Sequence, residues 1–122
     1  MDVVRAEAFA REWIEAWNRR DVEAIVSPYA DDVEFQSPLV VAPLHEPSGI
    51  VRGKERLREF VAKRLAAFPA ALEIELLGAY RGVASLVVHF EAKGRRTLEV
   101  MGFDHTGRIH RVLPHADTRT RA

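Results

Sequence analysis

The chain has 122 residues, 48% of them hydrophobic, and its 18 lysines and arginines balance 18 aspartates and glutamates. This length predicts one domain over residues 1–122, and the charge balance argues against binding of nucleic acid or anionic membranes. The absence of cysteine excludes disulfides, thiolate metal sites and cysteine nucleophiles. No apolar run reaches the roughly 20 residues of a membrane span. Charges interrupt the N-terminus where a signal peptide is apolar, so we expect a cytoplasmic protein.

The first third of the chain predicts two helices and a strand. Apolar residues recur at helical spacing over about 2–18, which predicts a helix with one apolar stripe. Asp21 is the expected N-cap of a short second helix. The segment "VEFQS" predicts a strand over about 33–37, and its alternation places Phe35 and Ser37 on the same face.

The middle of the chain predicts a long loop followed by a helix. Residues 38–52 hold three prolines and a glycine, which argues against regular helix there. Within this loop, His45 and Glu46 either close over a ligand or simply keep the loop solvated. From Gly53, apolar residues including Phe60 recur at helical spacing until Pro69, which ends the helix.

The second half of the chain predicts four strands in hairpin succession, over 71–80, 82–92, 96–103 and 107–115. Helices that are segregated in sequence from an antiparallel sheet indicate an α+β fold. We expect residues 116–122 to form a flexible tail.

Hairpin geometry predicts which strand residues share the inner face of the sheet. A two-residue turn at "KG" pairs Val88 with Glu99, and a four-residue turn at "DHTG" pairs Met101 with His110. The inner face then carries Leu72, Ile74, Leu76, Leu86, Val88, Phe90, Thr97, Glu99, Met101, Phe103, His110 and Val112.

Glu99 and His110 are the polar inner-face residues with the chemistry for proton transfer. A carboxyl group on an apolar wall has a raised pKa unless a cation compensates it. Such a group beside an imidazole forms an acid–base pair, and we expect Glu99 and His110 to be catalytic. The alternative is that the two groups only satisfy each other's hydrogen bonds.

The outer face of the sheet is also partly apolar, and no further helix remains to cover it. Under the same register it carries Leu77, Val87, Leu98, Val100, Ile109 and Leu113, with His89 and Glu91 beside them. A second copy of the chain is the simplest cover, which predicts a homodimer through this face. A three-residue turn at "KG" would instead bring His89 and Glu91 inside.

Three stretches carry a family resemblance: "WNRRDVEAIVSPYADDVEFQSP", "GIVRGKERLREFV" and "VMGFDHTGRIHRVLPH". With them the chain resembles the nuclear transport factor 2-like superfamily, in its SnoaL-like and ketosteroid-isomerase-like branch. The resemblance implies a curved antiparallel sheet wrapped by helices into a cone, with a pocket at the open end. Members include isomerases, polyketide cyclases, dehydratases, epoxide hydrolases and non-catalytic binding domains, so the fold alone does not settle the function.

The steroid isomerases of this superfamily use a tyrosine and two aspartates, one as base and one kept protonated. By the resemblance, the tyrosine position falls on Trp13, the base position on Ser37 and the protonated aspartate position on Glu99. An indole N–H does not ionise near neutral pH, and a serine without a partner base is a poor proton acceptor. The resemblance therefore implies a pocket without the steroid isomerase mechanism.

We expect one of two functions. The first is an isomerase, cyclase or dehydratase acting on an apolar carbonyl metabolite through Glu99 and His110, and the second is a non-catalytic ligand-binding or protein-interaction module. The five histidines lack metal-ligand spacing, so no metal or other cofactor is expected. The expected ligand contacts are Trp13, Trp17, Tyr29, Phe35, Ser37, Phe60, Met101, Phe103 and Val112.

Overall fold

The computed structural model describes residues 2–118 and has an α+β architecture. The helices are α1 (Val3–Asn18), α2 (Val22–Val26), η1 (Pro38–Val40, a 3-10 helix), α3 (Val41–Leu44) and α4 (Lys54–Ala67). The strands are β1 (Tyr29–Gln36), β2 (Ile50–Arg52), β3 (Glu75–Arg81), β4 (Ser85–Ala92), β5 (Arg95–Phe103) and β6 (Ile109–Ala116). The expected tail thus begins inside β6 at Ala116, and residues 119–122 lie outside the described part of the chain.

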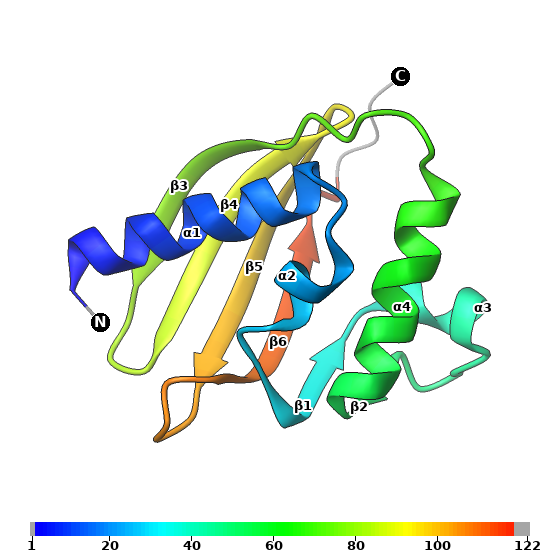
Figure 1. Cartoon of the computed structure of the whole chain (residues 1–122), viewed down its shortest axis with the longest axis horizontal. Coiled ribbons are helices and arrows are strands. Elements are labelled where there is room, and N and C mark those ends of the chain that lie inside the picture. Colours follow the sequence, from blue (N-terminus) through cyan, green and yellow to red (C-terminus); the bar gives the residue numbers. More distant parts are fainter. Residues whose placement is uncertain (1, 119–122) are drawn as a thin grey trace.

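The strands form one curved six-stranded sheet in the order β2-β1-β6-β5-β4-β3. Strand β1 runs parallel to β6, and the other neighbours are antiparallel. Figure 1 shows α1 crossing the β3–β5 side of the sheet, while α4 lies beside β1 and β2. The apolar core lies between these helices and the inner face of the sheet. No helix in residues 2–118 is long and apolar enough to cross a membrane.

Side-chain caps start the first two helices where the sequence predicts them. The Asp2 carboxylate accepts a hydrogen bond from the Arg5 amide at 2.8 Å, and that of Asp21 accepts one from the Ala24 amide at 3.1 Å. These bonds satisfy amide groups that have no partner within the helix. The short helix α2 is thereby held in place before β1.

The expectation of a loop over 38–52 is wrong, because this segment forms η1, α3 and β2. The Ser37 hydroxyl oxygen accepts from the Leu39 amide at 3.2 Å, which ends β1 and caps η1. Pro38 and Pro43 both lie in the first turn of a helix, where a missing amide hydrogen costs nothing. The prolines are therefore compatible with these short helices.

The connection from α4 to β3, residues 68–74, is held by side chains at the end of α1. The Arg20 guanidinium donates to the backbone carbonyls of Leu65, Phe68 and Ala70. The Asn18 amide donates to the Ile74 carbonyl at 3.0 Å and accepts from the Ile74 amide at 2.8 Å. This connection is thus fixed across one end of the sheet without secondary structure of its own.

The register of the β4–β5 hairpin is confirmed, and that of the β5–β6 hairpin is wrong. Val88 pairs with Glu99 as predicted, but Met101 pairs with Val112 instead of His110. The β5–β6 connection is one residue longer than expected, and a bulge between Gly102 and Phe103 adds a second residue on β6. The bulge residue is His110, which turns outward and is exposed.

The same bulge changes which face of the sheet Ile109, the residue before His110, lies on. Ile109, expected on the outer face, is completely buried in the core. Beyond the bulge the two added residues preserve the alternation, so Val112 still faces inward as expected.

Candidate active site

A cavity of about 440 Å³ opens between α1, α4 and the inner face of the sheet. Aromatic side chains build much of its wall. The Trp13 ring packs against Trp17 and Phe90 at centroid distances of 6.2 and 5.5 Å, and Phe35 packs against Phe60 at 5.5 Å. The cavity is therefore largely apolar, as small-molecule pockets usually are.

Most of the residues expected to contact a ligand lie in the wall of this cavity. Those that do are Trp13, Trp17, Tyr29, Phe35, Ser37 and Phe60, and Glu99, expected to be catalytic, lies in the wall with them. Met101 and Val112 are completely buried core residues instead, and Phe103 packs edge-on against Phe9 at 5.9 Å. These three lie toward the β5–β6 turn, whereas the cavity is lined by residues toward the opposite ends of these strands: Arg95, Thr97, Glu99, Pro114 and Ala116.

Further wall residues were not among the expected ligand contacts, although Leu72, Ile74, Phe90 and Thr97 were predicted to lie on the inner face of the sheet. The further wall residues are Leu39, Leu57, Val61, Arg64, Leu65, Phe68, Leu72, Ile74, Phe90, Ala92, Lys93, Arg95, Thr97, Pro114 and Ala116. The helical spacing of Leu57, Val61 and Leu65 in α4 marks an apolar face, but only the position of α4 shows that this face borders the cavity.

Glu99 is the carboxyl group of the cavity and is almost completely buried, with 6% of its surface exposed. Within residues 2–118 its carboxyl group has no hydrogen-bond or ion-pair partner. Burial raises the pKa of Glu99 to about 8. At neutral pH the group is therefore mostly a neutral acid, whose O–H can donate a hydrogen bond to a ligand.

Tyr29 supplies a second hydroxyl in the cavity. Its oxygen accepts a hydrogen bond from the Trp13 indole N–H at 3.1 Å. Burial raises the pKa of the Tyr29 phenol far above its ordinary value, and the proximity of Glu99 raises it further. Tyr29 therefore keeps its proton, and with Trp13 as donor its O–H is left to donate.

The Trp17 indole N–H is a third donor at this wall. It is buried, and it has no hydrogen-bond partner among the residues that the structure describes. A buried polar group without a partner costs stability. A ligand oxygen in reach of this N–H would remove that cost.

Ser37 is buried at the end of β1, with 5% of its surface exposed. Its hydroxyl oxygen caps η1, and its backbone amide donates to the Gly49 carbonyl at 2.8 Å. This position does not offer a general base to a ligand, because a capping hydroxyl remains a neutral group.

The expected Glu99–His110 pair is wrong. His110 is exposed at the bulge, beside Gly102, and it is not among the residues of the cavity wall. Nor do residues 2–118 contain a group of three or more His, Asp or Glu side chains that could hold a metal ion. Glu99 is thus the one carboxyl or imidazole group that the described part of the chain places in the wall.

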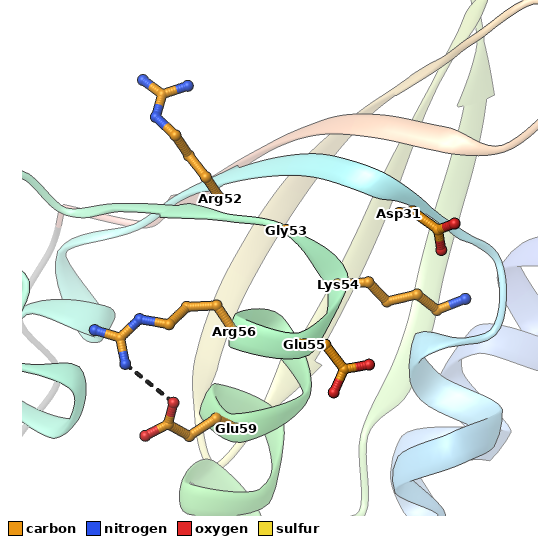
Figure 2. A pocket seen from close by; sticks show the side chains of 7 residues that line it. All are labelled: Asp31, Arg52, Gly53, Lys54, Glu55, Arg56 and Glu59. Atoms are coloured by element: carbon orange, nitrogen blue, oxygen red, sulfur yellow. Dashed lines mark hydrogen bonds and ion pairs between the residues drawn. The ribbon is translucent and has the colours of Figure 1, made fainter.

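A second hollow lies at the start of α4 and differs in character. Its wall consists of Asp31, Arg52, Gly53, Lys54, Glu55, Arg56 and Glu59. Figure 2 shows that the side chains of Arg52, Lys54 and Arg56 extend in different directions, and Arg56 pairs with Glu59 at 3.0 Å. Solvated charges of this kind do not form a desolvated site, so the apolar cavity is the better candidate.

A family model of the SnoaL-like domain matches residues 10–118. The chain belongs to the SnoaL-like domain family. Among solved structures, this SnoaL-like domain is similar to a SnoaL-like protein of unknown function from Burkholderia thailandensis. The two are 39% identical, the match covers 95% of this chain and 97% of the other, and the TM-score is 0.88.

More distant structures share the fold of this SnoaL-like domain. An NTF2-like protein of unknown function from Cytophaga hutchinsonii is 14% identical, over 92% of this chain and 89% of that one, with a TM-score of 0.67. A steroid delta-isomerase from Pseudomonas aeruginosa is 19% identical, over 92% of this chain and 79% of that one, also with a TM-score of 0.67. These structural matches establish the nuclear transport factor 2-like fold for this chain. No match was found among curated proteins.

Proposed function

We propose that this SnoaL-like domain binds an apolar metabolite with a carbonyl group, and that Glu99 transfers a proton at the carbonyl oxygen. The observation that carries the proposal is a buried carboxyl group without a partner in an apolar cavity. Burial raises the pKa of Glu99 to about 8, so the acid and its conjugate base are both accessible near neutral pH. The neighbouring Tyr29 hydroxyl offers a second donor to the same oxygen.

The reaction class that fits is an isomerisation, cyclisation or dehydration that begins with enolisation. Glu99 gives its proton to the carbonyl oxygen, which weakens the C–H bond on the adjacent carbon, and that hydrogen leaves as a proton to water to give the enol. The Glu99 carboxylate then takes a proton back from water. The aspartate base of the steroid isomerases has no counterpart at Ser37, whose oxygen caps η1. The proposed chemistry therefore depends on acid catalysis by Glu99.

Hydrogen–deuterium exchange on 2-tetralone, an apolar cyclic ketone, tests this chemistry without knowledge of the natural substrate. We expect the wild-type protein to accelerate exchange of the hydrogens next to the carbonyl, as followed by NMR in D₂O. Glu99→Gln replaces the carboxylic O–H with an amide N–H donor of similar shape that cannot give up a proton, so exchange should slow by about 100-fold. Binding of the ketone should change little.

The control for this experiment is Glu75→Gln, at an exposed position in β3. This variant should exchange 2-tetralone at the wild-type rate. Equal rates in the wild type and Glu99→Gln would contradict a role for Glu99 in proton transfer.

A non-catalytic binding module is the second candidate function. It is favoured by the absence of a second carboxyl or imidazole group from the described cavity wall, since proton-transfer enzymes commonly use an acid and a base. In that case 2-tetralone binds, but its exchange is no faster than in buffer. The same measurement therefore separates the two functions.

We also propose that a second copy of the chain covers the outer face of the sheet. Leu77 and Leu98 on this face are 39% and 43% exposed, and Val87, Val100 and Leu113 are half-buried beside them. Burial of a shared apolar patch of this kind favours a symmetric dimer.

The Leu98→Lys variant tests this dimer. Sedimentation at micromolar concentration should give a dimer for the wild type and a dissociation constant raised by about tenfold or more for the variant, because symmetry brings two added charges into the interface. Val83→Lys, at a fully exposed position between β3 and β4, adds the same charge as a control. A wild-type monomer would contradict the proposal.

A further inference from the structure

Three cationic side chains lie in the wall of the apolar cavity: Arg64, Lys93 and Arg95. Among residues 2–118, the same wall contains one carboxyl group, Glu99, which burial keeps mostly neutral. The whole chain has a formal net charge of zero, so the cavity is far more positive than the protein as a whole. The cavity wall therefore carries an excess of positive charge.

No carboxylate of the described chain forms an ion pair with any of the three. Elsewhere such pairs are common: Arg52 pairs with Glu34 at 2.6 Å, and Arg58 pairs with Glu23 at 2.9 Å. The Lys93 ammonium donates only to the Ala71 carbonyl, at 2.6 Å. Lys93 and Arg95 are exposed to solvent and Arg64 is partly buried, and within residues 2–118 none of the three charges has a carboxylate partner.

Arg64 is the least solvated of the three cations. It is partly buried, and loss of solvation lowers the pKa of its guanidinium. The guanidinium carbon lies 4.8 Å from the centre of the Phe68 ring, which compensates a cation only in part. A negatively charged oxygen would supply the interaction that the protein itself does not.

The three cations come from elements that meet at one end of the molecule. Arg64 is in the last turn of α4, and Lys93 and Arg95 lie on either side of Gly94 in the β4–β5 turn. Figure 1 shows both of these ends on the same side of the molecule, with the connection from α4 to β3 running between them. Glu99 lies farther along β5 and is buried, so the cations surround the outer part of the cavity.

We propose that the ligand of this cavity carries an anionic group, a carboxylate or a phosphate, that binds to Arg64, Lys93 and Arg95. This inference rests on the proposed function and narrows its substrate class. The apolar body of the ligand fills the aromatic part of the cavity, and its carbonyl oxygen meets Glu99 and Tyr29. The substrate is then an amphipathic molecule with a negative charge at one end and a carbonyl within its apolar part.

A pair of fluorescent probes with the same apolar body tests this charge selectivity. 1-Anilinonaphthalene-8-sulfonate is anionic, and N-phenyl-1-naphthylamine lacks the sulfonate. In the triple variant Arg64→Gln, Lys93→Gln and Arg95→Gln, the anionic probe should bind about tenfold more weakly or worse, since three partly exposed ion pairs each contribute a modest amount. The neutral probe should change by less than about twofold, because its binding depends on apolar contact.

Two further variants serve as controls. Arg11→Gln, Arg81→Gln and Arg108→Gln together remove the same charge at exposed positions outside the cavity wall, and should leave both probes unaffected. Arg64→Lys, Lys93→Arg and Arg95→Lys keep the charge at the cavity, and should largely keep binding of the anionic probe. Displacement by dodecanoate and by dodecyl phosphate then distinguishes the two anionic groups.

The outcomes separate this inference from the proposed function. Suppose the neutral probe binds to the wild type, and the triple glutamine variant weakens binding of both probes equally or of neither. The proposal of an anionic group on the ligand is then refuted, while ligand binding in the cavity stands. If the neutral probe does not bind to the wild type, the cavity is not a site for apolar ligands and the proposed function itself is contradicted.

Discussion

The Glu99→Gln variant is expected to be more stable than the wild type at pH 9 by roughly 3 to 5 kcal/mol, and about equally stable near pH 4. The reason is that burial raises the pKa of Glu99 to about 8 from the ordinary value of 4.5. Glutamine has the shape of the neutral acid and cannot ionise. The substitution therefore removes the cost of a buried negative charge.

The direction of the pH dependence follows from proton binding in the two states. Between pH 4.5 and about 8 the folded protein keeps the Glu99 proton that the unfolded chain has lost. The free energy of unfolding of the wild type therefore falls as the pH rises through this window. Above it both states are ionised, and the difference between wild type and variant becomes constant.

Urea unfolding at several pH values between 4 and 9 measures this difference. The exposed Glu75→Gln serves as the control and should follow the wild-type profile. Parallel profiles for the wild type and Glu99→Gln would show that Glu99 is not held as a neutral acid. The proposed acid catalysis would then lose its physical basis.

Trp13→Phe and Tyr29→Phe are expected to destabilise the protein by about 2 kcal/mol or more each, and by less in combination than their sum. The Trp13 indole N–H donates to the Tyr29 hydroxyl oxygen at 3.1 Å, and both side chains are buried. Either single substitution leaves one polar group without its partner. The double variant removes both groups, so a coupling energy of about 1 kcal/mol is expected.

The neighbouring Trp17 provides a matched control for this cycle. Its indole N–H has no hydrogen-bond partner within residues 2–118, so Trp17→Phe and Tyr29→Phe should be additive. Urea denaturation of the variants gives the two coupling energies. Additivity in the Trp13 cycle would show that Trp13 does not hold the Tyr29 hydroxyl, and that the phenol is free to rotate in the cavity.

The sequence predicted much of the fold because its signals are local. Helical periodicity predicts α1, the cap at Asp21 predicts α2, and a two-residue turn predicts the β4–β5 register. That register alone places Glu99 on the inner face, in the position where the resemblance to the steroid isomerases also placed an acid. The prediction that Glu99 lies inside the sheet is therefore confirmed.

The prediction of the Glu99–His110 pair was wrong because one extra residue in β6 changes the direction of the side chains there. The bulge at His110 is not visible in the pattern of apolar residues, yet it turns the imidazole outward and Ile109 inward. The prediction that Met101, Phe103 and Val112 contact a ligand was wrong for another reason. Strand periodicity gives the face on which a side chain lies, but not its distance along the strand from the cavity.

The sequence by itself determined the α+β fold, the buried acid at Glu99 and the absence of a base at Ser37, because these follow from periodicity, turn length and residue type. Only the tertiary structure decided which groups share the cavity. Arg64 comes from α4, Lys93 and Arg95 from the β4–β5 turn, and Tyr29 and Trp13 from β1 and α1. Segments this far apart in sequence meet because burying their apolar faces together excludes water, and that packing has no local signal in the chain.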